Sequence, residues 1–575
     1  MASATNKIRA KRGPVVETTG GKVQGTYLAG KTMTRFRGIP YAAPPVGERR
    51  WAPPAPVEQW DGVRPCANNA PTAFQLGAEM DAVIDQLANG VGLAPWKASA
   101  MAKAFRLIPK NESEDCLTLD VRAPAKAEGL PVMVWIHGGN HTDGAASEPM
   151  YQSEALPARS CVLVNIQYRL GMFGFLAHPE LSAESTDGVS GNYGLLDQIA
   201  ALEWVRDNTA AFGGDPGNVT IFGESAGGIA VLNLMTAPGA RGLFHKAIAQ
   251  SPSDGGRWLH LDRPTFNQSS AHDAGRSFAD ATVGPEPGQI ERLRAMDAKE
   301  LNVMYQTDEL LPHHAFPIVD GKVLPMEPMS AFSREAVADV PLLIGYNADE
   351  ATIFQGVFNP VGPEFGQNAS PTPDEIRSSL IESYGSESAA ETILAAYPGL
   401  IDGEQSAVDA HLGDHMFGAH VDHASRTHKA PVYRYHFRST SPLPNQTAGA
   451  YHAAELVHVF GSAIPGLPKA DDGHLLTAAM GDHWFAFAAT GNPAHPARND
   501  WPEYDPADPV QMVFDRPTSA AAACPPQVGL DAMRQRIEHL TEQFVGEGGG
   551  EWVEHDLPTS ADAADEPEAD PATTS

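Results

Sequence analysis

The feature that most constrains this chain is the stretch Val219–Val231. A β-branched and aromatic run leads into Gly-Glu-Ser-Ala-Gly (Gly223–Gly227), and helix-forming residues follow. This order predicts a strand, a sharp turn and a helix. The turn holds its serine in a strained backbone conformation, which requires small neighbours such as Gly223 and Gly227. The context therefore predicts a nucleophilic Ser225 at the end of a central strand, rather than an ordinary serine in a glycine-rich turn.

Continuous apolar runs elsewhere predict the sheet to which that strand belongs. Val132–Ile136 and Cys161–Ile166 have the length and composition of buried strands in a largely parallel sheet. A helix is predicted after Gly194, because apolar residues recur there at helical spacing. Further strand candidates are 15–18, 21–25, 114–121, 247–250, 342–345, 432–437 and 512–514. Strands that alternate with helices predict an α/β fold with a mostly parallel central sheet flanked by helices.

Composition excludes several classes of partner. The chain of 575 residues is 42% hydrophobic, enough to bury a large core, and carries a formal net charge of −31. This charge disfavours nucleic acid and anionic membranes as partners. No apolar run reaches the roughly 18 residues of a membrane span, and the basic N-terminus lacks the apolar stretch of a secretory signal. Only four cysteines occur, without a zinc or disulfide pattern, so we expect reduced thiols and a cytoplasmic protein.

The two ends of the chain and one internal segment differ from the body in composition. Residues 1–13 are expected to form a disordered arm, and residues 546–575, rich in Gly, Ala, Pro, Asp and Glu, a disordered acidic tail. A single catalytic domain is expected over residues 14–545. Residues 77–107 are rich in Ala and Met at helical spacing, and they are expected either to cap a site or to pack on the surface.

A serine nucleophile needs a histidine base, a carboxylate that orients the base, and donors for the oxyanion. The chain has 21 histidines, so the ends of strands narrow the choice. Asp349 and Glu350 closely follow the strand at 342–345, and His452 lies in a loop after a later strand. The order serine, carboxylate, histidine is that of α/β-hydrolases. These positions leave Asp349 and Glu350 as alternatives for the acid.

Many separate motifs, in the same order along the chain, resemble those of type-B carboxylesterases, the family that includes the cholinesterases. The resemblance covers almost all of residues 14–545. The matching stretches include Phe36–Ala42, Ser113–Leu117, His137–His141, Tyr168–Leu176, Gly191–Gln198, Phe212–Pro216, Glu224–Gly228, Val319–Pro325, Gly345–Glu350, Tyr451–Leu456 and Trp501–Glu503 with Tyr504.

The resemblance implies a role for individual residues. It makes Ser225 the nucleophile, Glu350 rather than Asp349 the orienting acid, and His452 the base. It places the oxyanion hole at the N–H groups of Gly139, Asn140 and Ala226. The family commonly has Gly or Ala and then Phe where this chain has Asn140 and His141, so a more polar pocket wall is expected.

The function implied is that of a serine carboxylesterase, which hydrolyses small-molecule esters through an acyl-serine intermediate without a metal or an organic cofactor. Carbamate, amide or lactone hydrolysis by the same triad is one alternative. A non-catalytic adhesion protein is another, although relatives of that kind have typically lost a triad residue. The histidines 411, 415, 420, 423 and 428 form a dense cluster that could suggest a metal site, but the resemblance implies an ordinary surface helix there.

Overall fold

The computed structural model describes residues 11–106, 111–253, 258–264, 269–308, 311, 315–355, 372–464, 467, 472–516, 518–524 and 528–546. Residues 1–10 of the expected arm and 547–575 of the expected tail lie outside this part. Residues 11–13 belong to the sheet and not to an arm, because strand β1 (Lys11–Thr18) pairs with β2 (Gly21–Leu28) from Lys11 onward. The basic residues at the start of this edge strand lack the apolar pattern that predicts a strand, so the sequence did not indicate that the strand begins at Lys11. Helix α17 (Val528–Gly546) extends to Gly546, the first residue assigned to the tail.

A sheet of 13 strands, counted over the described residues, runs through the molecule. The strands follow β1 and β2 in the spatial order β3 (Met33–Pro40), β5 (Thr118–Pro124), β7 (Val162–Ile166), β6 (Leu130–Ile136), β8 (Gly214–Glu224), β9 (Lys246–Gln250), β10 (Leu342–Asn347), β11 (Val432–Phe437), β12 (Val510–Asp515) and β13 (Thr518–Ala523), with β4 (Val63–Pro65) beside β2. From β7 to β12 every pairing is parallel. The antiparallel strands lie at the two edges.

The central strands are buried for a simple reason. Helices on a sheet leave no solvent-exposed side, so a parallel strand must be apolar along its whole length. Val132–Ile136 and Val162–Ile166 are apolar except for Asn165, and all of their side chains, Asn165 included, are at most 1% exposed. The α/β architecture expected from these runs is confirmed. Strand β8, which leads to Ser225, lies between β6 and β9 in the middle of the sheet.

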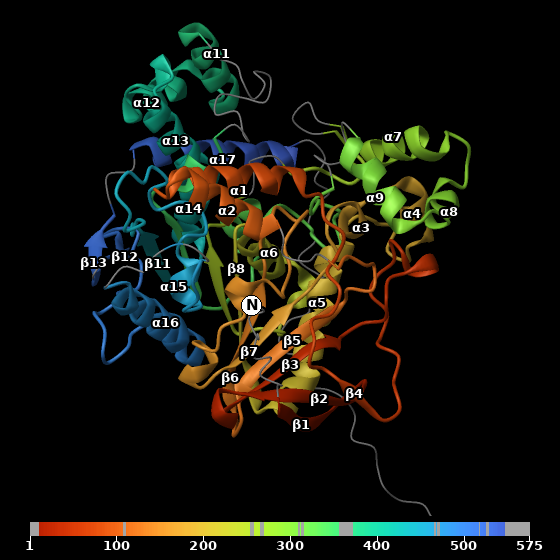
Figure 1. Ribbon diagram of the computed structural model, residues 1–575. Coiled ribbons are helices and arrows are strands. Elements are labelled where there is room, and N and C mark those ends of the chain that lie inside the picture. Colours follow the sequence, from red (N-terminus) through yellow and green to blue (C-terminus); the bar gives the residue numbers. More distant parts are fainter. Residues whose placement is uncertain are drawn as a thin grey trace, which may run out of the picture.

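Helices surround the sheet (Figure 1). The expected helix after Gly194 is α5 (Tyr193–Asn208), which buries Leu195, Leu202 and Val205. The other α-helices are α1 (Ala78–Gly90), α2 (Pro95–Arg106), α3 (Gly171–Phe175), α4 (Pro179–Glu184), α6 (Ala226–Thr236), α7 (Ala271–Val283), α8 (Gln289–Arg294), α9 (Ala298–Thr307), α10 (Pro328–Ser333), α11 (Pro373–Tyr384), α12 (Glu387–Ala396), α13 (Gln405–Gly413), α14 (Ala419–Thr427), α15 (Leu456–Val459) and α16 (Gly473–Thr490). None of the helices in the described part is long and apolar enough to cross a membrane.

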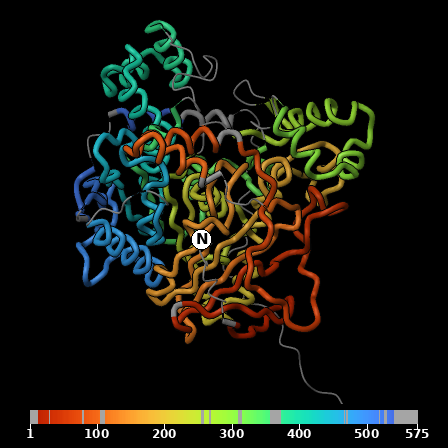
Figure 2. The backbone as a smooth tube through the Cα atoms, in the orientation of Figure 1, coloured from red at the N-terminus to blue at the C-terminus, as the bar shows by residue number. Residues whose placement is uncertain are grey.

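The chain progresses across the molecule from one edge of the sheet to the other. Figure 2 shows the first strands at the bottom and the C-terminal segments at the left, while α1 and α2 lie above the sheet. Gln86 of α1 donates to the carbonyl oxygen of Gln355 at 2.9 Å. The N–H groups of Thr447 and Ala448 donate to the carbonyl oxygen of Gly90 at 2.7 and 3.0 Å. The segment 77–107 thus packs on the loops that follow β10 and β11, a position that favours the interpretation as a cap.

Candidate active site

Ser225 occupies the sharp turn between β8 and α6. Its φ of 58° and ψ of −125° are strained for a residue with a side chain. The turn is fixed on both sides, because the Ser225 N–H donates to the Gln250 carbonyl oxygen at 2.9 Å and the Ser225 carbonyl oxygen accepts from the Ile229 N–H at 2.9 Å. A Cβ at Gly227 would collide with the carbonyl oxygen of Ile136. The strand, turn and helix predicted around Ser225 are therefore confirmed.

Glu350 and His452 meet beyond the ends of two neighbouring parallel strands, β10 and β11. His452 Nδ1 lies 2.6 Å from Glu350 Oε2. The other oxygen of Glu350 accepts from the Ser251 hydroxyl at 2.6 Å and from the Asn347 N–H at 2.7 Å. These donors fix the carboxylate in the orientation that His452 requires. The pairing is the one that the resemblance implies for the acid and the base.

Asp349, the alternative acid, has a different partner. Its carboxylate accepts from the backbone N–H of Ala450 at 2.7 Å. Asp349 thus ties down the loop that carries His452, and it is Glu350 that contacts the imidazole. Neighbouring residues in the turn after β10 point their side chains in different directions, which separates their roles.

The loop Gly138–His141 lies against the turn that carries Ser225. A Cβ added at Gly138 would come within 2.6 Å of the Glu224 carbonyl oxygen and 3.1 Å of Ser225 Cβ, so only glycine permits this approach. The next three residues have positive φ angles of 108°, 56° and 54° at Gly139, Asn140 and His141. This sharp bend brings the backbone expected to form the oxyanion hole beside the serine.

The two unusual residues of this loop face different surroundings. Asn140 is exposed, whereas His141 is only 3% exposed. The His141 ring packs against Phe175, with ring centroids 5.5 Å apart. Burial lowers the pKa of His141 to about 3, so its ring is neutral near pH 7. Asn140 therefore faces solvent and His141 packs against Phe175, and the more polar pocket wall expected from the two residues stays a prediction.

A second carboxylate contacts the imidazole of His452. Glu224 Oε1 lies 3.1 Å from His452 Nε2, and both side chains are buried. Burial lowers the pKa of His452, but the negative charges of Glu224 and Glu350 outweigh this effect and raise that pKa to about 9. Burial raises the pKa of Glu224 to about 8. The imidazole of His452 thus lies between two carboxylates, Glu350 at Nδ1 and Glu224 at Nε2.

Glu455 extends this polar cluster behind the histidine. Its carboxylate accepts from the Gln250 side chain at 2.8 Å and from the Asn347 side chain at 2.7 Å. Burial and the charge of Glu350 raise the pKa of Glu455. Because Gln250 and Asn347 end β9 and β10, the carboxylate joins the ends of two strands that support the site.

Comparison with known proteins agrees with this geometry. The model of the family described as "Carboxylesterase family" matches residues 12–529. The chain belongs to the carboxylesterase family. It is accordingly a carboxylic ester hydrolase with the α/β-hydrolase fold.

Relatives in this family come from bacteria and mammals. The para-nitrobenzyl esterase of Bacillus subtilis (strain 168) is 34% identical, over 87% of this chain and 94% of the relative. The fumonisin B1 esterase of Sphingopyxis macrogoltabida is 36% identical, over 85% of this chain and 84% of the relative. A solved PNB esterase structure has a TM-score of 0.71 and 32% identity, covering 91% of this chain and 99% of the other.

The histidine cluster is part of the core and not of an ordinary surface helix. Three of its members, His411, His420 and His423, are buried. Helix α14 is enclosed because it packs between α10 and α17. One ring nitrogen of each histidine has a protein partner: Tyr384 for His411 and His415, the Met416 carbonyl for His420, Ser333 for His423 and the Val340 carbonyl for His428. Over the described residues, no group of three or more His, Cys, Asp or Glu side chains is placed to hold a metal ion.

Sequence reasoning missed the carboxylates that surround the histidine. Glu224 directly precedes Ser225 within the predicted turn, so its place at the end of the central strand was an available signal. Glu455 lies three residues after His452, within the same motif Tyr451–Leu456. The contacts of Ser251 and Asn347 with Glu350 depend on which strands are neighbours in the sheet, and no local pattern carries that information.

Proposed function

We propose that Ser225, His452 and Glu350 are the catalytic triad with which this esterase cleaves its substrates. The observation that carries the proposal is the 2.6 Å contact between His452 Nδ1 and Glu350. Both residues follow the C-terminal ends of central parallel strands, as Ser225 follows the C-terminal end of β8. A buried carboxylate on Nδ1 orients the imidazole. The other nitrogen, Nε2, which Glu224 approaches to 3.1 Å, is the one assigned to proton transfer with Ser225.

The reaction then follows from the positions of these groups. Ser225 Oγ attacks the ester carbonyl carbon, and His452 Nε2 takes the hydroxyl proton and passes it to the leaving alcohol. Water repeats the sequence on the acyl-serine and releases the acid. The N–H groups of Gly139, Asn140 and Ala226 would donate to the oxyanion, a role supported by the bend of the loop against the turn and by the start of α6 at Ala226.

We infer a small-molecule ester as the substrate class. The named relatives act on small esters or are carboxylesterases. The buried carboxylates Glu224, Glu350 and Glu455 and the net charge of −31 favour neutral or cationic substrates over anionic ones. The same negative charge disfavours nucleic acid and anionic membranes as partners. The four free cysteines support a reducing compartment such as the cytoplasm.

Single replacements of the triad residues test the proposal. Ser225→Ala and His452→Ala should each lower kcat on p-nitrophenyl acetate by at least about 10,000-fold, and the double variant should lose little more, because the groups act as a unit. Glu350→Gln should cost about 1,000-fold. Asp349→Asn is the matched control and should be tolerated, since an amide oxygen can still accept from the Ala450 N–H. Greater damage from Asp349→Asn than from Glu350→Gln would contradict the acid assignment.

The oxyanion hole is tested at Asn140. Asn140→Ala keeps the backbone N–H, so kcat on a small acetyl ester should fall little. Asn140→Pro removes this donor, which is typically worth about 2.7–4 kcal/mol, or roughly 100- to 1,000-fold in kcat. Because proline fixes φ at about −65° and Asn140 has a φ of 56°, this variant also rearranges the loop, so its loss of kcat should be at least that large. Circular dichroism and the melting temperature of the proline variant must first show an intact fold. Equal losses in the two variants would assign the chemistry to the side chain and overturn the backbone role. Carbamates and amides assayed in parallel would define the bond that is cleaved.

A further inference from the structure

We propose that Phe417, held by a π-helical turn, is a positioning residue that fixes the His452 ring and stabilises its protonated form. The proposal rests on the proposed role of His452 as the base. The turn, Asp414–Gly418, joins α13 to α14 without a break in the helical path. Phe417 is 1% exposed and belongs to none of the motifs that indicated the triad.

Two phenylalanine rings cover the imidazole. The Phe417 and His452 ring centroids are 4.9 Å apart with an interplanar angle of 36°. Phe354 lies 5.1 Å from the same imidazole at 53°. The two phenylalanine rings are nearly parallel at 16°, with centroids 6.4 Å apart. Aromatic faces within about 6 Å attract a cation. This arrangement therefore favours the imidazolium that forms when Ser225 attacks.

The π-helical turn explains how one helical segment can serve two clusters. Asp414 accepts from the hydroxyls of Tyr346 and Tyr397 at 3.3 and 2.7 Å. In a regular α-helix, residues i and i+3 lie on the same face. The wider π-helical turn moves Phe417 away from the face of Asp414 and toward His452. Such turns are rare and occur frequently at functional sites.

Several contacts stabilise this costly local geometry. The Met416 carbonyl oxygen accepts from His420 Nδ1 at 2.9 Å. Gly418 leaves room for its neighbours, since a Cβ there would come within 2.8 Å of Asp414 Oδ1 and 3.1 Å of Leu530 Cδ2. Leu530 belongs to α17, so the C-terminal helix packs directly on the turn.

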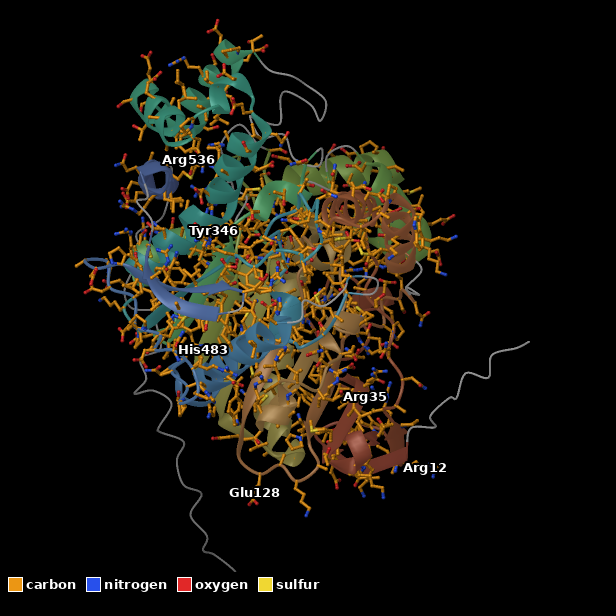
Figure 3. The ribbon with its side chains drawn as sticks, turned by 60° about the vertical axis from the view of Figure 1, so that its left-hand side comes forward. Arg12, Arg35, Glu128, Tyr346, His483 and Arg536 are labelled. Carbon is orange, nitrogen blue, oxygen red and sulfur yellow. The ribbon has the colours of Figure 1, made fainter. Side chains whose placement is uncertain are left out.

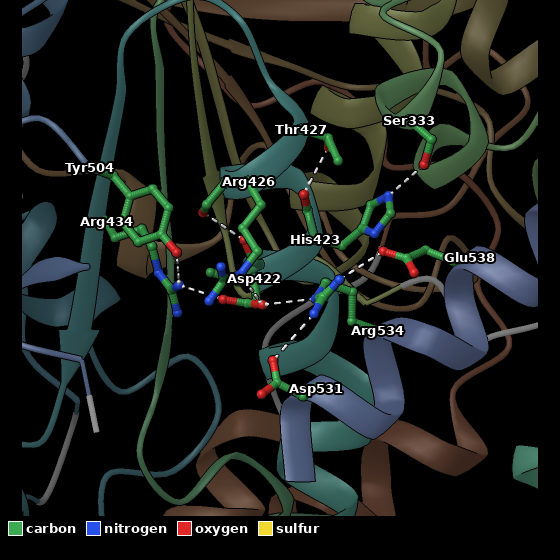
Figure 4. Close-up of polar contacts among 12 residues, drawn as sticks. Ser333, Asp422, His423, Arg426, Thr427, Arg434, Tyr504, Asp531, Arg534 and Glu538 are labelled. Carbon is green, nitrogen blue, oxygen red and sulfur yellow. Dashed lines mark hydrogen bonds and ion pairs between the residues drawn. The ribbon is translucent and has the colours of Figure 1, made fainter. Parts of the chain in front are cut away.

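Ion pairs at Asp422 hold the C-terminal helix α17 in place. Figure 4 shows Arg534 of α17 directed toward Asp422 of α14, at 3.8 Å. Asp422 also binds Arg434 of β11 at 2.9 Å and Arg426 at 2.8 Å. In Figure 3, Arg536 of α17 and Tyr346 of β10 lie on the same side of the molecule, away from Arg12. A chain of packed elements thus runs from α17 through the turn to His452.

The carboxylates near the base lie on other segments than this turn. Glu224 and Glu350 contact the imidazole, and the carboxylate of Glu455 acts on it from behind. None of the three belongs to the segment that carries Phe417. A change of Phe417 that preserves the fold therefore leaves these charges in place, and a shift in the titration of His452 reports the lost ring.

The test compares Phe417→Leu and Phe417→Tyr with Phe278→Leu, a matched change of a buried phenylalanine in α7. With p-nitrophenyl acetate, Phe417→Leu should lower kcat about three- to tenfold and change KM less than about twofold. The acid limb of kcat/KM should move about 0.5 pH unit lower, because loss of the ring destabilises the imidazolium and lowers the pKa of the base. Phe417→Tyr should recover most of both effects.

Three outcomes would overturn the proposal. They are an unchanged kcat and acid limb in Phe417→Leu, the same changes in Phe278→Leu, or no recovery in Phe417→Tyr. If Phe417→Leu does not fold, Phe417→Met, which fills more of the space with a flexible side chain, takes its place in the same assays. Activity in His452→Ala would refute the proposed triad itself, an outcome that is distinct from a null result at Phe417.

Discussion

At the scale of single residues, the imidazole of His452 meets a carboxylate at each ring nitrogen. Glu350 holds Nδ1, and Glu224 lies 3.1 Å from Nε2, the atom that exchanges a proton with Ser225 in the proposed mechanism. Burial raises the pKa of Glu224 to about 8, so the carboxyl is charged above that pH, where its charge supports the imidazolium and lowers the free energy of the state proposed for attack. The same charge also keeps the resting base protonated at higher pH.

Glu224→Gln tests both effects. Loss of the charge lowers the pKa of His452, so the neutral base persists to lower pH and the acid limb of kcat/KM should move down by about one unit or more. The maximal kcat should fall about tenfold, since the imidazolium loses a counter-charge. Asp482→Asn, which removes a charge from an ion-pair cluster with Arg159 and Arg498, is the control. An acid limb of kcat/KM that stays at the same pH or moves to higher pH in Glu224→Gln would contradict this account.

A second prediction at this scale concerns His141. In the described part of the structure, neither of its ring nitrogens has a hydrogen-bond partner although the side chain is buried. A buried polar group without a partner costs about 1–3 kcal/mol. His141→Phe keeps the contact with Phe175 and should raise the free energy of unfolding by about that amount. Urea denaturation at pH 7 measures the change, and a loss of stability would show that the imidazole has a polar role.

The sequence identified Ser225 as a candidate because its neighbours along the chain determine its environment. Glu350 and His452 were harder to choose from the chain alone, since Asp349 is adjacent and 21 histidines are present. The distinction depends on the directions of side chains after two parallel strands. The contact of Glu224 with His452 was not predicted, because the two residues lie more than 200 positions apart in the chain and meet only in the folded protein.

At the scale of elements, apolar runs predicted the central strands well because burial on both faces demands them. Edge strands are not predicted by apolar runs. Strand β13 consists largely of alanine, which has little preference for strands, and forms because it pairs with β12 along its full length. The π-helical turn was not predictable either, because its conformation depends on the tyrosines, His420 and Leu530 that surround it.

Gly418→Ala tests the packing of that turn. The added methyl group meets Asp414, Leu530 and Tyr346 at 2.8–3.2 Å, so the turn must shift, at a cost of about 1–3 kcal/mol in stability. We expect kcat to fall as well, since Phe417 moves with the turn. Gly239→Ala is the control, because there the methyl group meets only Ile199 Cδ1 at an ordinary 3.6 Å. Equal melting temperatures for the two variants would argue against a tightly packed turn.

At the scale of the whole molecule, buried histidines make stability sensitive to acid. Burial lowers the pKa of His137, His411 and His423 to about 4 and that of His141 to about 3, below the ordinary 6.5. The unfolded chain therefore binds more protons as the pH falls below 6.5. Stability is present above that pH and is lost as the pH approaches 4, at up to about 1.4 kcal/mol per pH unit for each histidine.

Denaturant unfolding between pH 7 and pH 4.5 measures this slope. We expect the four histidines together to contribute up to about 5 kcal/mol per pH unit in the middle of the range. His141→Phe removes one titrating group and should reduce the slope by about 1.4 kcal/mol per pH unit. Phe278→Leu, which changes no titrating group, is the control and should leave the slope unchanged. An unaltered slope in His141→Phe would mean that its imidazole does not resist protonation in the folded state.

The placement of the acid and the base on neighbouring strands also affects the order of events during synthesis. Glu350 and His452 are 102 residues apart in the chain and meet only when β11 adds to β10. If His452 is the base as proposed, a growing polypeptide that has folded around Ser225 lacks that base until β11 leaves the ribosome and joins the sheet. We therefore expect the nascent chain to gain esterase activity only when its fold is nearly complete, so that activity would report late assembly.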